Sequence, residues 1–300
     1  MIKRPMKAMS KSLTDKDAKL LNYPVVGSPK LDGIRALVID SQVLSSTLKP
    51  IGNKHIQMCL GKKIYNGLEG ELIVGDPCDP DSFNNTTGAV RRSSGEPDFK
   101  FYVFDNFNEP SLSYKDRFLN DSIKYAILPH IMVVEQTKID TFHELLLFEE
   151  MVVNKGYEGA MIRSFDGVYK EGRTTLREQN IFKRKPVSDA EAKIMGFNEQ
   201  MTNNNEQTLN ELGKHVRSSH KENKTPAGTL GSLILKCDLW DEPFSCGSGM
   251  TDEFKQEIWD NQDNYKELIV VFKYQAYGSR DKPRQPIFKG FRDKDDITEY

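Results

Sequence analysis

The sequence predicts an α+β protein of two domains, and three observations support this. Its 300 residues amount to two average domains of ~150 residues each. Short apolar runs with period-two alternation recur through the first two thirds of the chain beside stretches of helical periodicity, which favours antiparallel sheets carrying helices. The pattern changes near residues 186–189, so we expect domains of residues 1–187 and 188–300.

Six apolar runs of the first domain are predicted to be strands, because β-branched and aromatic residues dominate them. These runs are residues 34–39, 70–74, 99–107, 131–135, 159–163 and 181–185. Two stretches with helical periodicity, residues 115–127 and 140–156, are predicted to be helices. The second has an N-cap at Asp140 or Thr141 and a stop signal at Gly156.

The second domain is predicted to be a small barrel of the OB type. Strands are expected at residues 192–197, 231–237 and 266–277, with one small helix at 251–259, and short strands with glycine-rich turns suit such a barrel. A polar excursion at 198–229 interrupts this pattern. A structureless loop of this length is uncommon in a compact domain, and such loops are usually functional or disordered.

Composition places the chain among ordinary globular proteins, with 37% hydrophobic and 29% charged residues. A net charge of −2 gives no global basic field, so a nucleic acid would have to be bound by local clusters of cations. The four cysteines form no C-x-x-C pair, which indicates neither a zinc site nor a disulfide framework. The sequence has neither an apolar membrane span nor a signal peptide, so we expect a cytoplasmic protein.

A lone lysine, Lys30, precedes an Asp-Gly pair in the stretch SPKLDGIR, residues 28–35. One interpretation is a β-hairpin with Lys30 as a solvated cation, because Asp-Gly between apolar runs is a strong turn signal. The alternative is a functional site. The blocks LEGE, FYVFD, YEGAMIR and FKRK follow in order and place charged residues in or beside apolar strands, which indicates a shared pocket.

The residue types in these blocks suit phosphate chemistry. Lys183 and Lys185 alternate, so they share one face of their strand and could bind a polyphosphate. Glu71 and Glu158 offer oxygen ligands to Mg²⁺, which takes only one or two carboxylates from a protein. An exposed Phe104 could stack on a base. The P-loop motif for phosphate binding does not occur in the sequence.

Structural interpretations of several of these residues stay open. Phe104 could belong to the core, as aromatic residues in strands more often do. Glu158 could pair with Arg163 or with a lysine of the blocks instead of a metal. Asp32 could chiefly shape its turn, and Asp105 is expected to be structural.

In their order these blocks resemble the nucleotidyltransferase motifs of ATP-dependent DNA ligases, most closely the small two-domain ligases of viruses and phages. The resemblance includes STLKPIGN, YKDR, YKEGRTTL and a tail containing KYQAYGSRDKPRQPIFKGFRDKDD. It implies an adenylation (nucleotidyltransferase) domain followed by an OB-fold domain. The implied function is ATP-dependent sealing of 3′-hydroxyl/5′-phosphate nicks through an AMP carried on Lys30, with ATP and Mg²⁺ or Mn²⁺ as cofactors. A monomer acting on nicked duplex DNA in a host's cytoplasm or nucleoid is expected.

The resemblance also implies roles for individual residues. Lys30 is the expected nucleophile, and Lys183 and Lys185 are expected to grip the α-phosphate. Contacts to the nucleotide are expected from Ser28, Arg35, Glu71, Phe104 and Glu158, of which Glu158 and Glu71 are the expected metal ligands. The region that orients pyrophosphate includes Arg284, Arg292 and Asp296.

DNA contacts are implied for two regions of the chain. Lys49 and Arg173 are expected to meet DNA phosphates in the first domain. The insert at about 198–229 resembles a latch that wraps the duplex, with cationic contacts from Lys214, Arg217, Lys221 and Lys224. Such phosphate contacts are salt-sensitive and carry no sequence information.

One position departs from the family pattern. Residues 45–50 read SSTLKP where the relatives read SRTxKP, so Ser46 replaces an arginine that usually meets the nick 5′-phosphate. We expect partial substitution by Lys49 or Lys54 and a raised KM for nicked DNA. The alternatives are an RNA ligase, a GTP-using mRNA capping enzyme, which the latch-like insert and the tail disfavour, or a non-catalytic nick-binding protein, which the serine alone favours.

Overall fold

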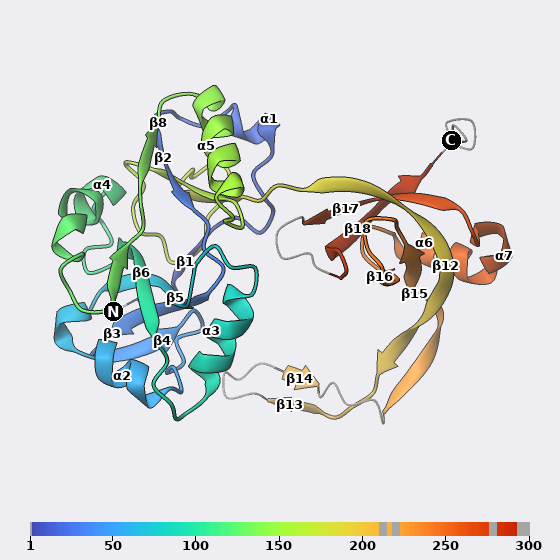
Figure 1. Ribbon diagram of the computed structural model, residues 1–300, viewed down its shortest axis with the longest axis horizontal. Coiled ribbons are helices and arrows are strands. Elements are labelled where there is room, and N and C mark those ends of the chain that lie inside the picture. The colour runs from blue at the N-terminus through green and yellow to red at the C-terminus, as the bar shows by residue number, and fades with distance from the viewer. Residues whose placement is uncertain (1, 210–214, 218–222, 276–280, 293–300) are drawn as a thin grey trace. The chain divides into compact units, whose positions relative to one another are not determined.

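The computed structural model describes residues 2–209, 215–217, 223–275 and 281–292. The chain divides into two compact units, Met1–Pro186 and Val187–Tyr300 (Figure 1). Each unit has sheets and a buried hydrophobic core of its own. Within the described residues, no helix is both long and apolar enough to cross a membrane.

The larger sheet of the first unit has five strands, and its neighbours are antiparallel except for the last pair. Along the sheet the order is β4 (Gln42–Ser45), β3 (Ile34–Ile39), β5 (Leu68–Val74), β6 (Phe99–Asn106) and β7 (Ile131–Val133). Phe99, Phe101 and Val103 of β6 are buried while Lys100 is exposed, which is the alternation that predicts this strand. Beside this sheet lie α2 (Lys54–Leu60), the 3₁₀ turn Lys63–Tyr65 and α3 (Ser82–Arg91).

The smaller sheet of the first unit is antiparallel throughout. Its order is β11 (Ile181–Arg184), β9 (Ala160–Ser164), β2 (Val25–Pro29) and β8 (Thr137–Ile139). The helices α1 (Asp15–Ala18) and α5 (Phe142–Asn154) pack on it, and β1 (Met6–Lys7) pairs with β10 (Gly172–Arg173). The side chain of Thr141 caps α5 and Gly156 follows its end with a φ of 93°, so this predicted helix is confirmed.

The Asp-Gly pair after Lys30 does not form a hairpin. Strand β2 pairs with β9 on one edge and β8 on the other, so β3 finds no free edge there and joins the larger sheet. Residues 30–33 therefore cross from one sheet to the other. A Cβ at Gly33 would clash with the carbonyl oxygen of Leu72 and with Ile73, so the crossing needs a residue without a side chain.

The helix predicted at residues 115–127 is broken in two. It consists of α4 (Tyr114–Arg117) and a 3₁₀ segment, Leu119–Lys124. Between them Phe118 has a φ of −134° and is buried, with its ring stacked between those of Tyr114 and Tyr125. Packing of this ring in the core interrupts the helix, and helical periodicity alone gives no sign of the break.

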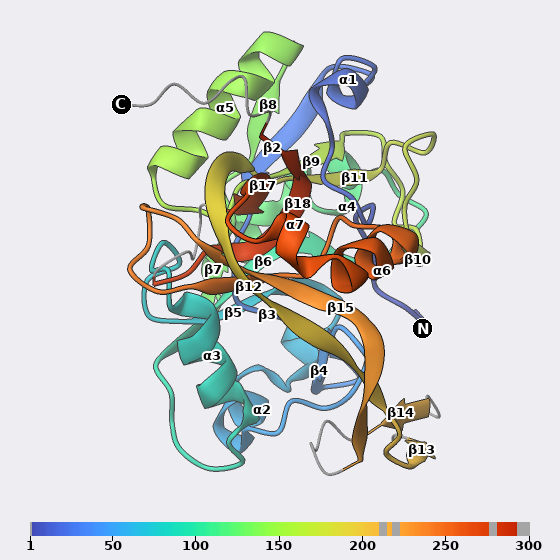
Figure 2. The same cartoon turned by 90° about the vertical axis from the view of Figure 1, so that its right-hand side faces the viewer.

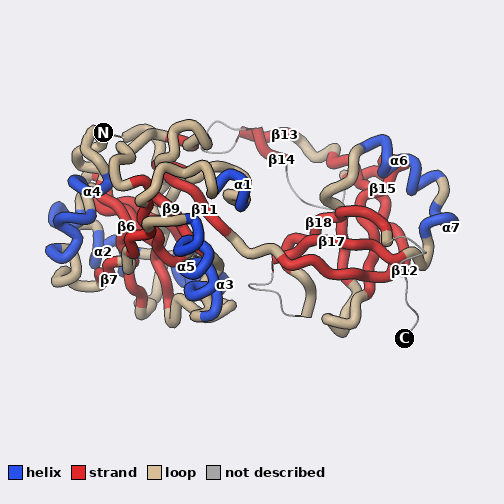
Figure 3. Tube along the Cα trace, turned by 90° about the horizontal axis from the view of Figure 1, so that it is seen from above, coloured by secondary structure: helices blue, strands red, loops and turns tan. Residues whose placement is uncertain are grey.

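The second unit contains one antiparallel sheet of five strands. Its order is β16 (Phe244–Cys246), β15 (Lys224–Lys236), β12 (Ser188–Asn203), β17 (Ile269–Gln275) and β18 (Arg284–Phe291). An isolated bridge between Ser248 and Ile287 links its two edges, so the sheet curls toward the predicted barrel without a full closing ladder. The helices α6 (Asp252–Asp260) and α7 (Gln262–Tyr265) complete the unit (Figure 3).

The polar excursion is not a structureless loop. Its two flanks extend β12 and β15 into a two-stranded arm, in which Asn203 pairs with Lys224 (Figures 1 and 2). A further strand pair, β13 (Gln207–Leu209) and β14 (His215–Arg217), lies between them in the sequence. None of residues 198–203 and 224–229 is buried, so these strands lack the apolar alternation by which a strand is recognised.

We predict that Gly33→Ala lowers the free energy of unfolding of the first unit by about 1–3 kcal/mol, because the added methyl group meets backbone that cannot move aside cheaply. The matched control is Gly88→Ala within α3, where a Cβ meets nothing within 4 Å and should raise stability by about 0.5–1 kcal/mol. Urea unfolding followed by circular dichroism measures both. Equal effects of the two substitutions would contradict the crossing geometry.

Candidate active site

Three charged residues meet at one end of the smaller sheet because of its antiparallel order. Lys30 follows β2, Glu158 precedes β9, and Lys185 follows β11. Since β9 runs antiparallel to both neighbours, these positions coincide, and Ala160 is the register partner of both Pro29 and Arg184. The backbone N–H of Lys30 donates to Gly159 O at 2.8 Å, which fixes this lysine beside the start of β9.

The carboxylate of Glu158 is shared by two lysines. Its Oε2 pairs with Lys30 Nζ and its Oε1 with Lys185 Nζ. The Glu158 side chain is 1% exposed. Burial alone would raise the pKa of Glu158, but the two ammonium groups outweigh it and hold this pKa below its usual value. The interpretation of Glu158 as the partner of a lysine therefore describes this structure, whereas Arg163 pairs elsewhere.

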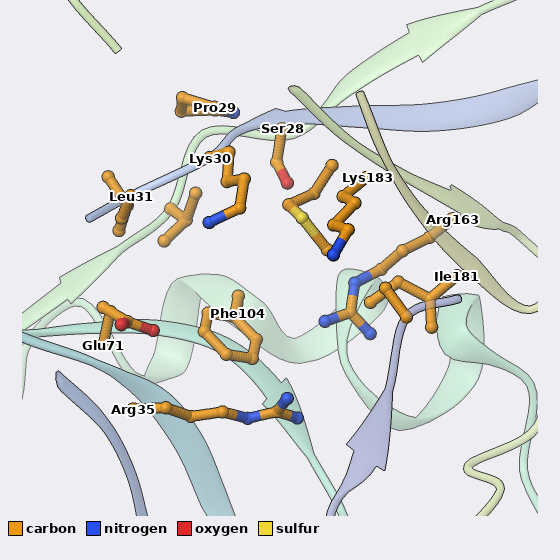
Figure 4. A pocket seen from close by; sticks show the side chains of 13 residues that line it. Ser28, Pro29, Lys30, Leu31, Arg35, Glu71, Phe104, Arg163, Ile181 and Lys183 are labelled. Carbon is orange, nitrogen blue, oxygen red and sulfur yellow. The ribbon is translucent and has the colours of Figure 1, made fainter. Parts of the chain in front are cut away.

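A cavity of about 280 Å³ lies beside this cluster. Among its lining residues are six that the sequence singled out, namely Ser28, Lys30, Arg35, Glu71, Phe104 and Lys183. Figure 4 shows the amino groups of Lys30 and Lys183 on one side of the Phe104 ring and Arg35 running along the other. Phe104 packs against the buried cluster of Leu31, Ile73 and Val134 and is partly exposed at this wall.

Alternation along β11 places its lysine in the cavity wall. Lys183 lines the cavity, and Arg184 points the other way, where its Nε donates to Glu149 Oε2 at 2.9 Å. Burial, followed by the charges of Lys185 and Lys30, lowers the pKa of Lys183. Lys185 follows the end of β11 and pairs with Glu158, so only Lys183 of the two predicted lysines lines the cavity.

Arg35 is fixed by a partner that the sequence analysis missed. Its Nε donates to Glu69 Oε1 at 2.8 Å, and its Nη2 donates to the carbonyl of Met6 at 2.6 Å. The hydroxyl of Tyr169 donates to Glu69 Oε2 at 2.8 Å. Glu69 and Glu71 are two residues apart in the LEGE block, so their shared face was the signal that could have identified this partner.

Two guanidinium groups flank the Phe104 ring. Those of Arg35 and Arg163 lie 5.6 and 5.3 Å from its centroid. Arg163 is held by Asp105, since its Nη1 donates to Asp105 Oδ2 at 2.7 Å, and Arg117 Nε donates to Asp105 Oδ1 at 2.9 Å. Asp105 thus orients the cavity wall from behind, as its expected structural role requires.

Glu71, on β5, is a carboxylate that lines the cavity, whereas Glu158 is not among the lining residues. Burial raises the pKa of Glu71 to about 7, against the lowering effect of the Lys30 and Arg35 charges. Among the described residues, no three carboxylate, histidine or cysteine side chains gather as a ready-made metal site. Any metal here would have Glu71 or Glu158 as a ligand and would need further ligands from its substrate.

The remaining predicted residues are distributed over the first unit, the second unit and the ranges outside the described part. Lys49 lines a second hollow, and Arg173 Nη1 donates to the carbonyl of Ala8 at 3.0 Å. In the second unit, Arg284 begins β18 and Arg292 Nη1 pairs with Glu191 Oε1 at 2.9 Å. Lys224 begins β15, and Arg217 is the last residue of β14. Three predicted residues lie outside the described ranges: Lys214, Lys221 and Asp296.

We predict that the pKa of Glu71 makes stability depend on pH. The value of about 7 lies above the ordinary 4.5, so the protonated side chain is favoured in the folded state. The contribution of protonated Glu71 to the free energy of unfolding is complete below pH 4.5 and is lost as the pH rises to about 7. Glu71→Gln, which stays neutral, should therefore gain stability over the wild type by on the order of 2 kcal/mol between pH 5 and 8. Urea unfolding at both pH values measures this, and a pH-independent difference would contradict the shift.

The sequence matches two family profiles in succession. Residues 5–185 match the ATP dependent DNA ligase domain, and residues 223–292 match the DNA ligase OB-like domain. The first match alone covers more than half of the chain. Together they confirm the predicted order of an adenylation domain followed by an OB-fold domain.

Solved and curated relatives agree with the profiles. Two structures of Chlorella virus DNA ligase-adenylate are 29% and 31% identical, with TM-scores of 0.55, and cover 97% and 99% of this chain and all of theirs. A Lig E DNA ligase shares the fold, with 20% identity and a TM-score of 0.68 over 97% of this chain and all of its own. DNA ligases of African swine fever virus are 26% identical over 149 residues, which is 48% of this chain.

The match spans about a third, 34%, of the length of those swine fever virus relatives. The two profiles and the viral ligase structures nevertheless agree in order with the two units of this chain. The lysine, carboxylate and aromatic residues of the cavity stand in the blocks that resemble the ligase motifs. The chain therefore belongs to the ATP-dependent DNA ligase family.

Proposed function

We propose that this protein is an ATP-dependent DNA ligase that seals 3′-hydroxyl/5′-phosphate nicks in duplex DNA. The observation that carries the proposal is the Lys30 amine in the wall of a cavity that also presents Lys183 and Phe104. The solved Chlorella virus relatives are ligase-adenylates, which agrees with a covalent AMP as intermediate. A cavity with an amine, a second cation and an aromatic ring suits a nucleoside triphosphate better than an uncharged ligand.

In the first step, Lys30 Nζ gives up a proton to solvent and attacks the α-phosphorus of ATP. A nitrogen–phosphorus bond forms while the bond to the bridging oxygen breaks, and pyrophosphate leaves with that electron pair. The protein's contribution is to place the amine in line with the leaving group and to neutralise the charge on the phosphate oxygens. Lys183 and Lys185 supply this neutralisation from one face of their strand.

The ion pairs of Glu158 must rearrange for this step. Both of its oxygens are occupied by Lys30 and Lys185 in the structure. A triphosphate offers these lysines a more highly charged partner, which frees the carboxylate. Glu158 and Glu71 would then be the residues that hold Mg²⁺, an ion that takes only one or two carboxylates from a protein. The bound ion would supply charge neutralisation to the phosphates.

The base and the ribose have separate partners. We assign adenine to the Phe104 ring, on which a planar base can stack at the cavity wall. Arg35 and Glu71 are polar groups of the same wall, and we assign them to the ribose. The Glu69 carboxylate holds Arg35 beside the ring.

The AMP then passes to the 5′-phosphate of the nick, and the 3′-hydroxyl displaces it to join the strands. Lys49, Arg173 and the arm formed by β12 and β15 are assigned to DNA phosphates. Arg284 and Arg292 are assigned to pyrophosphate during the first step. These roles rest on the order of the motifs; Arg173 and Arg292 are exposed in the described structure, and Lys49 and Arg284 are half-buried.

We predict that the protein incubated with Mg²⁺ and α-labelled ATP carries label that survives denaturation, and that nicked DNA discharges it with sealing. Lys30→Arg should lower labelling at least about 1000-fold, because a guanidinium is never deprotonated at neutral pH. Lys124→Arg, an exchange at an exposed lysine, is the matched control. Absence of label with either ATP or GTP would exclude the nucleophile, and label from GTP alone would indicate a capping enzyme.

We predict that residues 204–223, which connect the two strands of the arm, contribute to DNA affinity through phosphate contacts of their cations, among them Lys214, Arg217 and Lys221. Residues 204–223 can be replaced by Asn-Gly, because Asn203 and Lys224 are paired and a two-residue turn closes such a ladder. The shortened protein should still be labelled by ATP but should bind nicked duplex more weakly. The slope of log affinity against log salt should fall by about 0.9 for each phosphate contact removed. Fluorescence anisotropy measures both, and an unchanged slope would contradict this role.

A further inference from the structure

A second hollow of about 830 Å³ lies next to the nucleotide cavity in the first unit. The two share Arg35 and Glu71 in their walls, so a ligand in the hollow borders the nucleotide site. One wall is the turn at residues 45–52, and the other is the face of α3 that carries Thr87, Val90 and Arg91. A substrate group bound in this hollow would therefore lie next to a nucleotide bound in the first cavity.

The charge of this hollow is positive. Its charged lining residues are Arg35, Lys49, Arg91 and Glu71. Arg35 is already neutralised by Glu69, so the remaining charges of the lining are two cations, Lys49 and Arg91, and one carboxylate, Glu71. Lys49 and Arg91 therefore dominate the field, which suits an anion.

Position 46 does not contribute to this charge. Ser46 lines the hollow with an uncharged side chain. The turn that carries it is closed by backbone hydrogen bonds from Ser45 N to Lys49 O at 2.7 Å and from Leu48 N to Ser45 O at 2.8 Å. Lys54, the other cation considered as a substitute, is not among the residues that line the hollow.

Arg91 lies in a helix that is held in place by hydrogen bonds at two points, and among the described residues it has no ion-pair partner. The helix α3 is tied to β5 because Val74 N donates to the buried Thr86 Oγ1 at 3.0 Å. Its last turn is tied to the start of α2, where the buried Asn53 donates from Nδ2 to Ala89 O at 3.4 Å. Within the described ranges Arg91 makes no ion pair, and its side chain is exposed toward the hollow.

We propose that Arg91 binds the terminal 5′-phosphate of the DNA strand that accepts AMP, supplying from α3 the guanidinium that position 46 lacks. The proposal deepens the ligase function and rests on it. A terminal phosphate carries up to two charges and presents three oxygens, which a planar guanidinium can grip with two parallel hydrogen bonds. Lys49 adds a point charge from the opposite wall. Arg91 thus selects ends that can accept AMP and positions them beside the nucleotide.

The test compares two nicked duplexes that differ only in a 5′-phosphate or a 5′-hydroxyl at the nick. Affinities are measured by anisotropy without divalent ions, so that no sealing occurs. The wild type should prefer the phosphate, and Arg91→Ala should lower this preference by about 10- to 100-fold, as expected for loss of a charge-assisted pair. Arg92→Ala is the matched control, because Arg92 is the next residue, equally charged and exposed, and does not line the hollow.

Two further variants separate a phosphate contact from a structural role. Arg91→Lys keeps the charge but loses the bidentate fork, so it should recover only part of the preference. Ser46→Arg added to Arg91→Ala should restore it, because the new guanidinium would enter the same hollow from the opposite wall. Sealing rates are expressed per molecule of lysine-bound AMP, which corrects for any unfolded protein.

The outcomes distinguish this inference from the proposed function. An Arg91→Ala protein that keeps the full 5′-phosphate preference would overturn the role of Arg91 while leaving the ligase function intact. An equal loss in Arg92→Ala would also overturn it, since general charge would then explain the effect. Failure of the wild type to form lysine-bound AMP would refute the ligase proposal itself, and the binding preference would still be measurable.

Discussion

The carboxylate of Glu158 is buried between Lys30 and Lys185, and this shared ion pair orders the cationic side of the cavity. A buried carboxylate is costly to desolvate, so it is retained only where cations compensate it. If either lysine is removed, the ion pair with the remaining lysine alone must compensate the desolvation of the Glu158 carboxylate. The three residues can meet only because β9 lies between β2 and β11 and runs antiparallel to both, so the sheet order is a condition for the chemistry.

The same arrangement recurs around the rest of the cavity. Glu69 holds Arg35 from behind, and Asp105 holds Arg163 and Arg117. In each case a buried anion fixes a cation whose other face is turned to the cavity or to an aromatic ring. The cavity therefore presents fixed cations to its ligand, and a polyphosphate bound there need not order them at its own expense.

Much of the site was predictable from the sequence because its residues stand in short, ordered blocks with period-two spacing. Lys183 lines the cavity as alternation predicts, and Lys185, which follows the end of β11, pairs with Glu158. The crossing of residues 30–33 was not predictable, since local turn signals report nothing about which strand edges are already paired. Glu69 was missed for a related reason: its role depends on Arg35 of a neighbouring strand. The break of the predicted helix at Phe118 depends on how this ring packs in the core against Tyr114 and Tyr125, which helical periodicity does not report.

The arm of β12 and β15 has a consequence for how firmly the second unit holds together. A two-stranded ribbon with no buried face is barely stable alone, but these strands continue, with register shifts between Ile194 and Met201, from the sheet core at Leu230 and Ile194. Their hydrogen bonds are therefore supported at the base and progressively less toward Asn203 and Lys224. Backbone amides of the arm should exchange with solvent faster the closer they lie to Asn203 and Lys224. The arm therefore opens locally without unfolding of the domain that carries it.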